Sequence, residues 1–364
     1  MKAILESFDI DYIEIYSAMA KSMAYWHSEA LGFTLQALKN AETGHPGISS
    51  YMMKSRDIRL VITSTYPSQH AADGEISAFI SSNYCGVKRI ALKVPSVKLI
   101  FEHCMANGAV PTKFPCIQQD EFGKIEEAGI KFYDHSELLF ISREQYVGVF
   151  KPGYKQVTTS VDEKEEVFTN IDHVASEVRI NEMSFWTKYL TDTIGTSLVQ
   201  RIKKSADNRT GMMLNINQSH DKKLTLVIAE PESYLGKSKV QQNIDAFGPG
   251  IHHLAFATED LIQTAEQLLK KNVEFVTFPP AYYDLLRTNE DFREIDIDIL
   301  QKLNILCDKE GDTYLMQKFI KPISDRPFFL YEIVQRVNGY SGFALKNINI
   351  LKKAEEMEIM RTVE

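Results

Sequence analysis

The chain has 364 residues, of which 44% are hydrophobic and 25% are charged, and its formal net charge is −8 at pH 7. This length predicts two domains, and the balance of residues is typical of a globular protein. The negative charge argues against a nucleic-acid or membrane partner, while four scattered cysteines and the lack of a signal-peptide or membrane-span segment predict a cytoplasmic protein.

The first predicted elements lie in residues 8–33, which read as a strand, an amphipathic helix carrying a tryptophan, and a glycine-marked turn. The same pattern returns in residues 168–195. A second strand, "GVKRIALKVPSV" at 86–97, returns as "GIHHLAFATEDL" at 250–261. The two shifts are nearly equal, 161 residues from Tyr12 to His173 and 164 from Arg89 to His253. Two echoes at one shift indicate a duplicated domain.

Between the copies, residues 151–166 combine a Pro-Gly turn with a run of charges, which is typical of a linker. We therefore predict an N-terminal domain over 1–155 and a C-terminal domain over 156–364. Only the second copy carries histidines at the matching strand starts, His173 and His253. This predicts a structural first half and an active second half, although packing alone also explains single histidines.

The strand "GIHHLAF" places His252 beside His253. Successive strand side chains point to opposite faces, so alternation predicts that only one of the two faces a functional cavity. Small Ala255 shares a face with His253, whereas large Leu254 and Phe256 share one with His252.

Near the C-terminus, Glu332 interrupts the apolar strand "RPFFLYEIVQRV" of residues 326–337. A carboxylate in such a strand is costly unless it is paired or bound to metal. Arg336 and Lys321 are possible ion-pair partners. With His173 and His253, Glu332 instead forms the two-histidine, one-carboxylate set that suits non-haem Fe(II), and Zn²⁺ accepts the same ligands.

These motifs resemble the 4-hydroxyphenylpyruvate dioxygenase and 4-hydroxymandelate synthase family, which has the vicinal-oxygen-chelate fold. The resemblance covers nearly the whole chain. It is carried by "IDHVASEV", "GIHHLAFATEDL", "FPPAYYDLL", "KPISDRPFF", "FLYEIVQR" and "GYSGFALKN", and by "FGKIEEAGIKFYDHSELLF" in the first half.

The resemblance implies an α+β fold of duplicated βαβββ modules, with a C-terminal open barrel that holds the metal and a C-terminal helix as its lid. It implies Fe(2+) as cofactor, with His173, His253 and Glu332 as ligands. His252 then falls where the family usually has glutamine. We also expect a homo-oligomer, a dimer or tetramer.

The implied reaction is the oxidative decarboxylation of a 2-oxo acid by O₂ with hydroxylation of its side chain. The substrate is 4-hydroxyphenylpyruvate or a related aryl or alkyl pyruvate. Two alternatives share this fold: an extradiol ring-cleaving dioxygenase, which also shares the ligand set, and a metal-free ligand-binding protein.

Several predicted substrate-binding residues match the family and others depart from it. The matching residues are Gln317, Phe319, Phe343 and Asn347. The departing residues are Ile348, Lys239, His252, Leu214 and Ala229. The family carries polar side chains where this chain has Leu214 and Ala229. Their loss predicts a less polar side chain on the substrate, such as that of phenylpyruvate or a branched-chain oxo acid. The alternative is a pocket of changed shape that still binds 4-hydroxyphenylpyruvate. Lys239 either contacts the substrate carboxylate or extends into solvent.

The last predicted element is a helix over about residues 340–360, in which Ile348, Leu351 and Ala354 have helical apolar spacing. We expect this helix to pack over the cavity.

Overall fold

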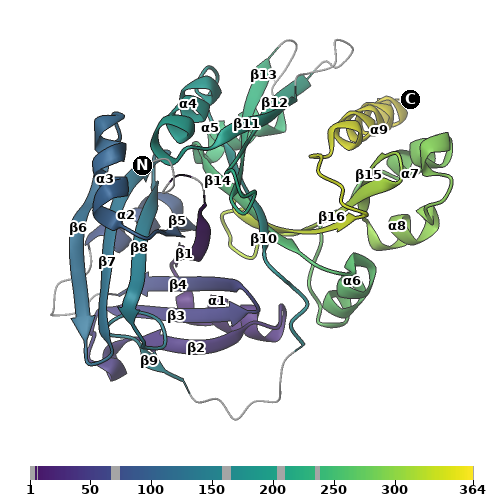
Figure 1. Ribbon diagram of the computed structural model, residues 1–364. Coiled ribbons are helices and arrows are strands. Elements are labelled where there is room, and N and C mark those ends of the chain that lie inside the picture. Colours follow the sequence, from purple (N-terminus) through teal and green to yellow (C-terminus); the bar gives the residue numbers. More distant parts are fainter. Residues whose placement is uncertain are drawn as a thin grey trace.

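A computed structural model of the chain describes residues 5, 7–66, 74–157, 165–202, 210–233 and 238–363. In this part of the chain, the strands form two curled sheets that lie side by side, one from each half of the sequence (Figure 1). Each half contains two successive β-α-β-β-β units, which confirms the predicted α+β class.

The first half builds a sheet with the order β6-β7-β8-β5-β1-β4-β3-β2-β9. Its first unit is β1 (Asp9–Ser17), α1 (Ala20–Glu29), β2 (Thr34–Lys39), β3 (Ile48–Ser55) and β4 (Ile58–Thr65). Its second unit is β5 (Cys85–Lys93), α3 (Val97–Ala106), β6 (Pro111–Asp120), β7 (Gly123–Phe132) and β8 (Ser136–Tyr146). The 3-10 turn η2 (Ala41–Thr43), the helix α2 (Gly74–Asn83) and the short β9 (Lys155–Gln156) complete it.

The second half builds a sheet with the order β11-β12-β13-β10-β14-β17-β16-β15. Its first unit is β10 (Ile171–Glu177), α4 (Met183–Ile194), β11 (Ser197–Ile202), β12 (Thr210–Gln218) and β13 (Thr225–Ser233). Its second unit is β14 (Gly250–Ala257), α6 (Leu261–Lys270), β15 (Leu306–Glu310), β16 (Thr313–Ile320) and β17 (Leu330–Val337). The connecting elements are α5 (Lys239–Phe247), α7 (Pro280–Arg287), η3 (Glu290–Phe292) and α8 (Ile297–Leu303).

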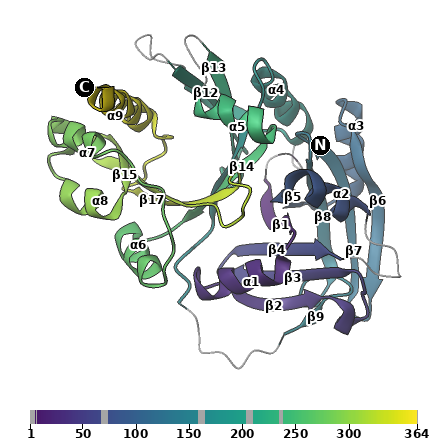
Figure 2. The ribbon, with the colours of Figure 1, turned by 180° about the vertical axis from the view of Figure 1, so that it is seen from behind.

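The C-terminal helix α9 (Leu345–Val363) lies beside α7 in both views (Figure 2). Ala354 on α9 is fully buried, while Ile348 and Leu351 face a cavity of the second sheet. The predicted closing helix is therefore present, and its apolar face covers that cavity.

The strand register shows that the two halves are copies of one another. The central strands of each sheet, β1 with β5 and β10 with β14, pair antiparallel. Equivalent residues occupy equivalent positions: Tyr12 opposite Ala91 and Glu14 opposite Arg89 in the first sheet, His173 opposite Ala255 and Ala175 opposite His253 in the second. Tyr12 thus corresponds to His173 and Arg89 to His253, as the two sequence echoes predict.

Aromatic side chains join the two halves into one core. Phe33 from the first half packs against Phe168 and Phe256 from the second, with ring centroids 6.1 Å and 5.9 Å away. All three side chains are fully buried. Because burying one phenylalanine contributes about 1.5–3 kcal/mol, this cluster holds the sheets together.

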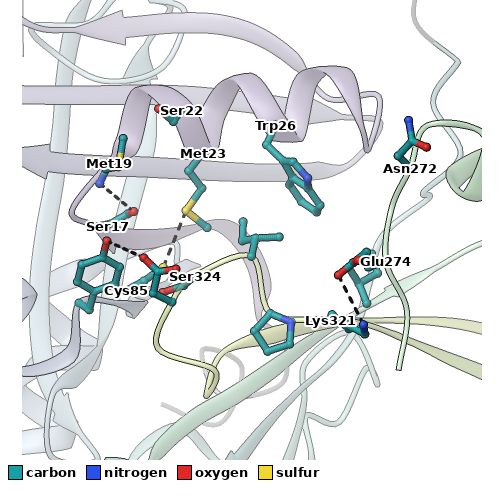
Figure 3. A pocket seen from close by; sticks show the side chains of 15 residues that line it. Ser17, Met19, Ser22, Met23, Trp26, Cys85, Asn272, Glu274, Lys321 and Ser324 are labelled. Carbon is teal, nitrogen blue, oxygen red and sulfur yellow. Dashed lines mark hydrogen bonds and ion pairs between the residues drawn. The ribbon is translucent and has the colours of Figure 1, made fainter. Parts of the chain in front are cut away.

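A cavity of about 350 Å³ also lies at this junction, between the α1 region of the first half and the loop that joins β16 to β17. Figure 3 shows Ser17, Met23 and Trp26 on the first-half side, and Lys321 with its ion-pair partner Glu274 on the other. None of the predicted site residues lines this cavity.

One buried histidine couples the halves directly. His27 on α1 is fully buried, with its Nδ1 2.7 Å from the carbonyl oxygen of Met23 and its Nε2 2.6 Å from the hydroxyl of Tyr331 on β17. The carbonyl only accepts, so Nδ1 donates to it and Nε2 accepts from Tyr331. Burial lowers the pKa of His27 to about 4.

We expect the stability that depends on neutral His27 to disappear in acid. An unfolded histidine has a pKa of about 6.5, so the folded state binds fewer protons, and stability falls as the pH drops from about 6.5 to about 4. The expected contribution is about 3 kcal/mol. Urea unfolding of His27→Phe should lack this part of the pH dependence, whereas a variant of the exposed His220, His220→Phe, should retain it. An identical pH dependence in His27→Phe and in the unmodified protein would contradict this assignment.

Candidate metal centre

Three adjacent strands in the middle of the second sheet, β10, β14 and β17, carry His173, His253 and Glu332. The Oε2 atom of Glu332 lies 3.2 Å from Nε2 of His173 and 3.1 Å from Nε2 of His253. Within the described residues this is the one group of three or more His, Cys, Asp or Glu side chains whose potential ligand atoms converge, all within 4.8 Å of one another.

The three side chains form a largely buried cluster, in which the His253 side chain is the most exposed at 16%. Glu332 is 1% exposed and His173 is 6% exposed. Burial alone raises the pKa of Glu332, but the two histidines outweigh it and lower that pKa to about 2. Burial likewise lowers the pKa of His173, but Glu332 and Asp172 raise it to about 9. The carboxylate is therefore ionised, as a metal ligand must be.

His252 and His253 do not point to opposite faces as alternation predicts, because both side chains line the same cavity. The register shows the reason. Ala175 pairs with His253 and the next residue, Ser176, pairs with Ile251, so His252 is the extra residue of a β-bulge. A bulge interrupts the period of two and turns the extra side chain toward its neighbour's face.

A second bulge precedes His173. Ile171 pairs with Phe256 and His173 with Ala255, which leaves Asp172 as the extra residue. The first half has bulges at the corresponding positions, Asp11 and Lys88. The bulges therefore belong to the repeated module and are not confined to the half that carries the histidines.

Each bulge residue orients the histidine that follows it. Asp172 Oδ1 lies 2.8 Å from Nδ1 of His173, and His252 Nδ1 lies 2.8 Å from Nδ1 of His253. Because Nδ1 of each candidate ligand is engaged, Nε2 of each faces Glu332. Burial, then His253 and Lys239, lower the pKa of His252 to about 3, so its ring is neutral and able to accept.

We expect His252→Ala to retain iron but to bind it about 10- to 100-fold more weakly, the usual effect of removing a group that orients a ligand. His252→Gln should restore the affinity, because its amide oxygen can accept from His253. Lys88→Ala, at the equivalent bulge, is the matched control and should bind iron as the unmodified protein does. Competition with a chelator measures all three affinities, and complete iron loss in His252→Ala would contradict the prediction.

A hydrogen-bonded chain holds the other oxygen of Glu332. Gln317 Nε2 donates to Glu332 Oε1 at 2.7 Å, Asn347 Nδ2 donates to Gln317 Oε1 at 3.1 Å, and Tyr282 Oη donates to Asn347 Oδ1 at 2.6 Å. These hydrogen bonds link β17 and β16 to α9 and α7. The closing helix therefore helps to set the orientation of the Glu332 carboxylate. The candidate ion-pair partners of Glu332 instead contact Asp172, in the case of Arg336, and Glu274, in the case of Lys321.

Arg336 clamps Asp172 with two hydrogen bonds, Nε to Oδ2 at 2.7 Å and Nη2 to Oδ1 at 2.9 Å. Its Nη1 donates to the carbonyl oxygens of Tyr340 and Gly342, at 3.3 Å and 2.8 Å. Arg336 therefore joins the residue that orients His173 to the segment that leads into α9.

A cavity of about 260 Å³ opens beside the three candidate ligands. Of the predicted substrate-binding residues, eight line it: Gln317, Phe319, Phe343, Asn347, Ile348, His252, Leu214 and Ala229. Lys239 does not line it. It is exposed at the first position of α5, which fits the solvent-facing alternative.

Sequence reasoning missed Glu177, which also lines the cavity and is 6% exposed. The signal was available, because Glu177 lies two residues beyond Ala175 and four beyond His173 on the same strand. Alternation within "HVASE" puts all three on one face. The cavity wall is apolar at Leu214 and Ala229, as expected, but Glu177 adds a carboxyl group that the sequence reasoning did not foresee.

The first half has no equivalent ligand set. Tyr12 and Arg89 occupy the histidine positions, and Leu139 lies opposite Ala91 as Glu332 lies opposite Ala255. Arg89 is tied to acidic groups, including Glu14 at 2.8 Å. The first half thus fills its equivalent space with apolar side chains and ion pairs.

Comparisons with known proteins agree with this geometry. The profile of the Glyoxalase/Bleomycin resistance protein/Dioxygenase superfamily matches residues 170–293. A 4-hydroxyphenylpyruvate dioxygenase from Tetrahymena thermophila is 30% identical over 96% of this chain and 89% of its own length. The chain belongs to the 4-hydroxyphenylpyruvate dioxygenase family.

Other members of the 4-hydroxyphenylpyruvate dioxygenase family match over similar lengths. The Yarrowia lipolytica enzyme is 28% identical over 96% of this chain and 91% of its own. A solved triple mutant of 4-hydroxymandelate synthase from Streptomyces coelicolor superposes with a TM-score of 0.82 at 22% identity, over 96% of this chain and 98% of that one. The fold is the predicted vicinal-oxygen-chelate fold, and the chain is a dioxygenase.

Within the described residues, no helix has the length and apolarity needed to span a membrane.

Proposed function

We propose that this chain is an Fe(II)-dependent dioxygenase that oxidatively decarboxylates a 2-oxo acid. In the overall reaction, one 2-oxo acid and one O₂ yield CO₂ and a carboxylic acid that is one carbon shorter and hydroxylated on its side chain. One oxygen atom of O₂ enters the new carboxyl group and the other enters the hydroxyl group. Family membership and the convergence of His173, His253 and Glu332 at a cavity support this proposal.

The donor set fits iron. Two imidazole nitrogens and one carboxylate oxygen face one point, and this set leaves coordination positions free on Fe(II). We infer that Nε2 of His173, Nε2 of His253 and Oε2 of Glu332 hold the metal. Bound there, iron supplies a site where a 2-oxo acid and O₂ react side by side.

The chain's own residues orient the ligands and enclose the site. Asp172 and His252 fix the two imidazoles through Nδ1, and Gln317 fixes Glu332 through Oε1. Phe343, whose ring meets that of His173 edge-on with centroids 6.1 Å apart, and the apolar face of α9 line the cavity and limit the access of water to it. Exclusion of water protects an oxidising centre from side reactions.

The cavity suits a small 2-oxo acid with an aryl or branched alkyl side chain. Beside the ligands its lining is largely apolar, including Leu214, Ala229, Phe319 and Ile348. A site of about 260 Å³ lies near the lower end of the volumes of ligand pockets, which matches a molecule of one ring and a three-carbon acid.

We also propose the domain division at residues 155 and 156 and a homo-oligomeric assembly.

The test is iron content together with O₂ uptake on a panel of aryl and alkyl 2-oxo acids and catechols. We expect about one iron per chain and O₂ uptake with 2-oxo acids alone. Uptake with catechols only would favour ring cleavage, and a protein without iron or O₂ uptake would favour a binding protein. Either result would overturn the proposal.

A further inference from the structure

The wall of the cavity contains one carboxyl group in an otherwise apolar row. Glu177 on β10 pairs with Ala229 on β13, and Ala229 pairs with Leu214 on β12. Residues in register on neighbouring strands point to the same face, and all three line the cavity. Glu177 is not one of the candidate metal ligands and takes no part in the hydrogen bonds that orient them.

Glu177 has one engaged oxygen and one free oxygen. Asn243, which is 5% exposed on α5, donates from Nδ2 to Glu177 Oε1 at 3.1 Å. His252 Nε2 lies 3.9 Å from the same Oε1, beyond hydrogen-bond range. Glu177 Oε2 is buried and has no hydrogen-bond partner among the residues that the structure describes.

A buried carboxylate with a free oxygen is costly, and a donor that reaches that oxygen lowers the cost of the ionised form. Burial raises the pKa of Glu177 to about 8, and a donor that reaches Oε2 would favour the ionised form and lower that pKa again. Because Glu177 lines the cavity, the group placed to supply the missing donor is a molecule bound inside it. The chelating end of a 2-oxo acid is needed at the metal, so the donor belongs to the end of its side chain.

We propose that Glu177 is a specificity-determining residue that accepts a hydrogen bond from a donor at the end of the substrate's side chain. The preferred substrates are then 2-oxo acids whose side chain ends in a hydroxyl or N–H group. This inference rests on the proposed function and refines the expectation of a less polar substrate. The body of the side chain lies against apolar residues and its tip is polar.

The test compares three 2-oxo acids of nearly equal size: 4-hydroxyphenylpyruvate, 4-aminophenylpyruvate and 4-methylphenylpyruvate. The first two carry O–H and N–H donors and the third carries none. With the iron-loaded enzyme, we expect kcat/KM for the better donor substrate to exceed that for the methyl compound at least tenfold, as for a hydrogen bond to a charged or strongly polar group. Equal values, or a preference for the methyl compound, would overturn the proposal without affecting the assignment as a 2-oxo acid dioxygenase.

Variants then assign the preference to Glu177. In Glu177→Leu, the ratio of kcat/KM for the better donor substrate to kcat/KM for the methyl compound should fall at least tenfold. The kcat/KM for the methyl compound itself should stay the same or rise. Glu177→Gln keeps an acceptor oxygen and should retain part of the preference. Glu230→Gln changes a buried acid on β13 outside the cavity lining, where the carboxylate accepts from Met183 N at 2.8 Å, and should leave the substrate ratio unchanged.

A merely structural Glu177 would give a different result. All three substrates would then fall by the same factor in Glu177→Leu, with the ratio intact, and the proposal would be wrong. If Glu177→Leu fails to fold, Glu177→Gln decides: a partly reduced ratio supports the proposal and an unchanged ratio overturns it.

Discussion

Replacing His173, His253 or Glu332 with alanine is expected to abolish both iron retention and turnover. The three side chains lie at the centre of the second sheet, with His173 and Glu332 buried and His253 16% exposed, and each supplies one of three donors that face a single point. With three protein ligands, each replacement should weaken metal binding by about 10²-fold or more, on the scale of protein metal sites. Iron content after desalting, together with O₂ uptake, measures the effect.

The first half supplies the control for this prediction. Tyr12 occupies the position equivalent to His173 but receives a hydrogen bond from Lys151 Nζ at 3.2 Å. Tyr12→Phe should therefore leave iron content and turnover unchanged. Full iron retention in His253→Ala, or iron loss in Tyr12→Phe, would mean that the metal lies elsewhere.

Replacing Arg336 with methionine is expected to destabilise the protein by about 3–5 kcal/mol, because it leaves the buried carboxylate of Asp172 without its cation. The Asp172 side chain is 9% exposed and its pKa is well below the usual range despite burial, because Arg336 and His173 stabilise the charged form. The same change also frees the carbonyl oxygens of Tyr340 and Gly342 at the entry to α9. We therefore expect a lower unfolding midpoint together with weaker iron binding.

The duplicated fold provides a matched control here too. Asp11 and Arg143 form the equivalent pair in the first half, with Nη2 of Arg143 2.7 Å from Oδ1 of Asp11. Arg143→Met should cost comparable stability and leave iron affinity unchanged. If both variants weaken iron binding equally, the effect of Arg336 acts through global stability and not through His173.

The sequence predicts those features that depend on local pattern. The helix that closes the cavity follows from the apolar spacing of Ile348, Leu351 and Ala354, and the repeat follows from two echoes at nearly one shift. These predictions are confirmed because each depends on residues close in sequence or on a whole copied module. The assignment of His173, His253 and Glu332 as iron ligands stays a prediction, as does the domain boundary.

Features that depend on register and on distant contacts could not be predicted in the same way. Alternation fails at His252 because a bulge adds one residue to β14, and no residue type in "GIHHLAF" marks it. The chain from Glu332 through Gln317 and Asn347 to Tyr282 joins four elements whose proximity only the fold establishes.

The metal centre is expected to couple O₂ consumption to the decarboxylation of a 2-oxo acid. The most direct measurement follows O₂ uptake and release of labelled CO₂ from a 2-oxo acid labelled at its carboxyl carbon, in the iron-loaded protein. We predict that one labelled CO₂ is released for each O₂ consumed. In His173→Ala we predict neither O₂ uptake nor release of CO₂. O₂ uptake without release of labelled CO₂, or equal release by His173→Ala, would contradict the account.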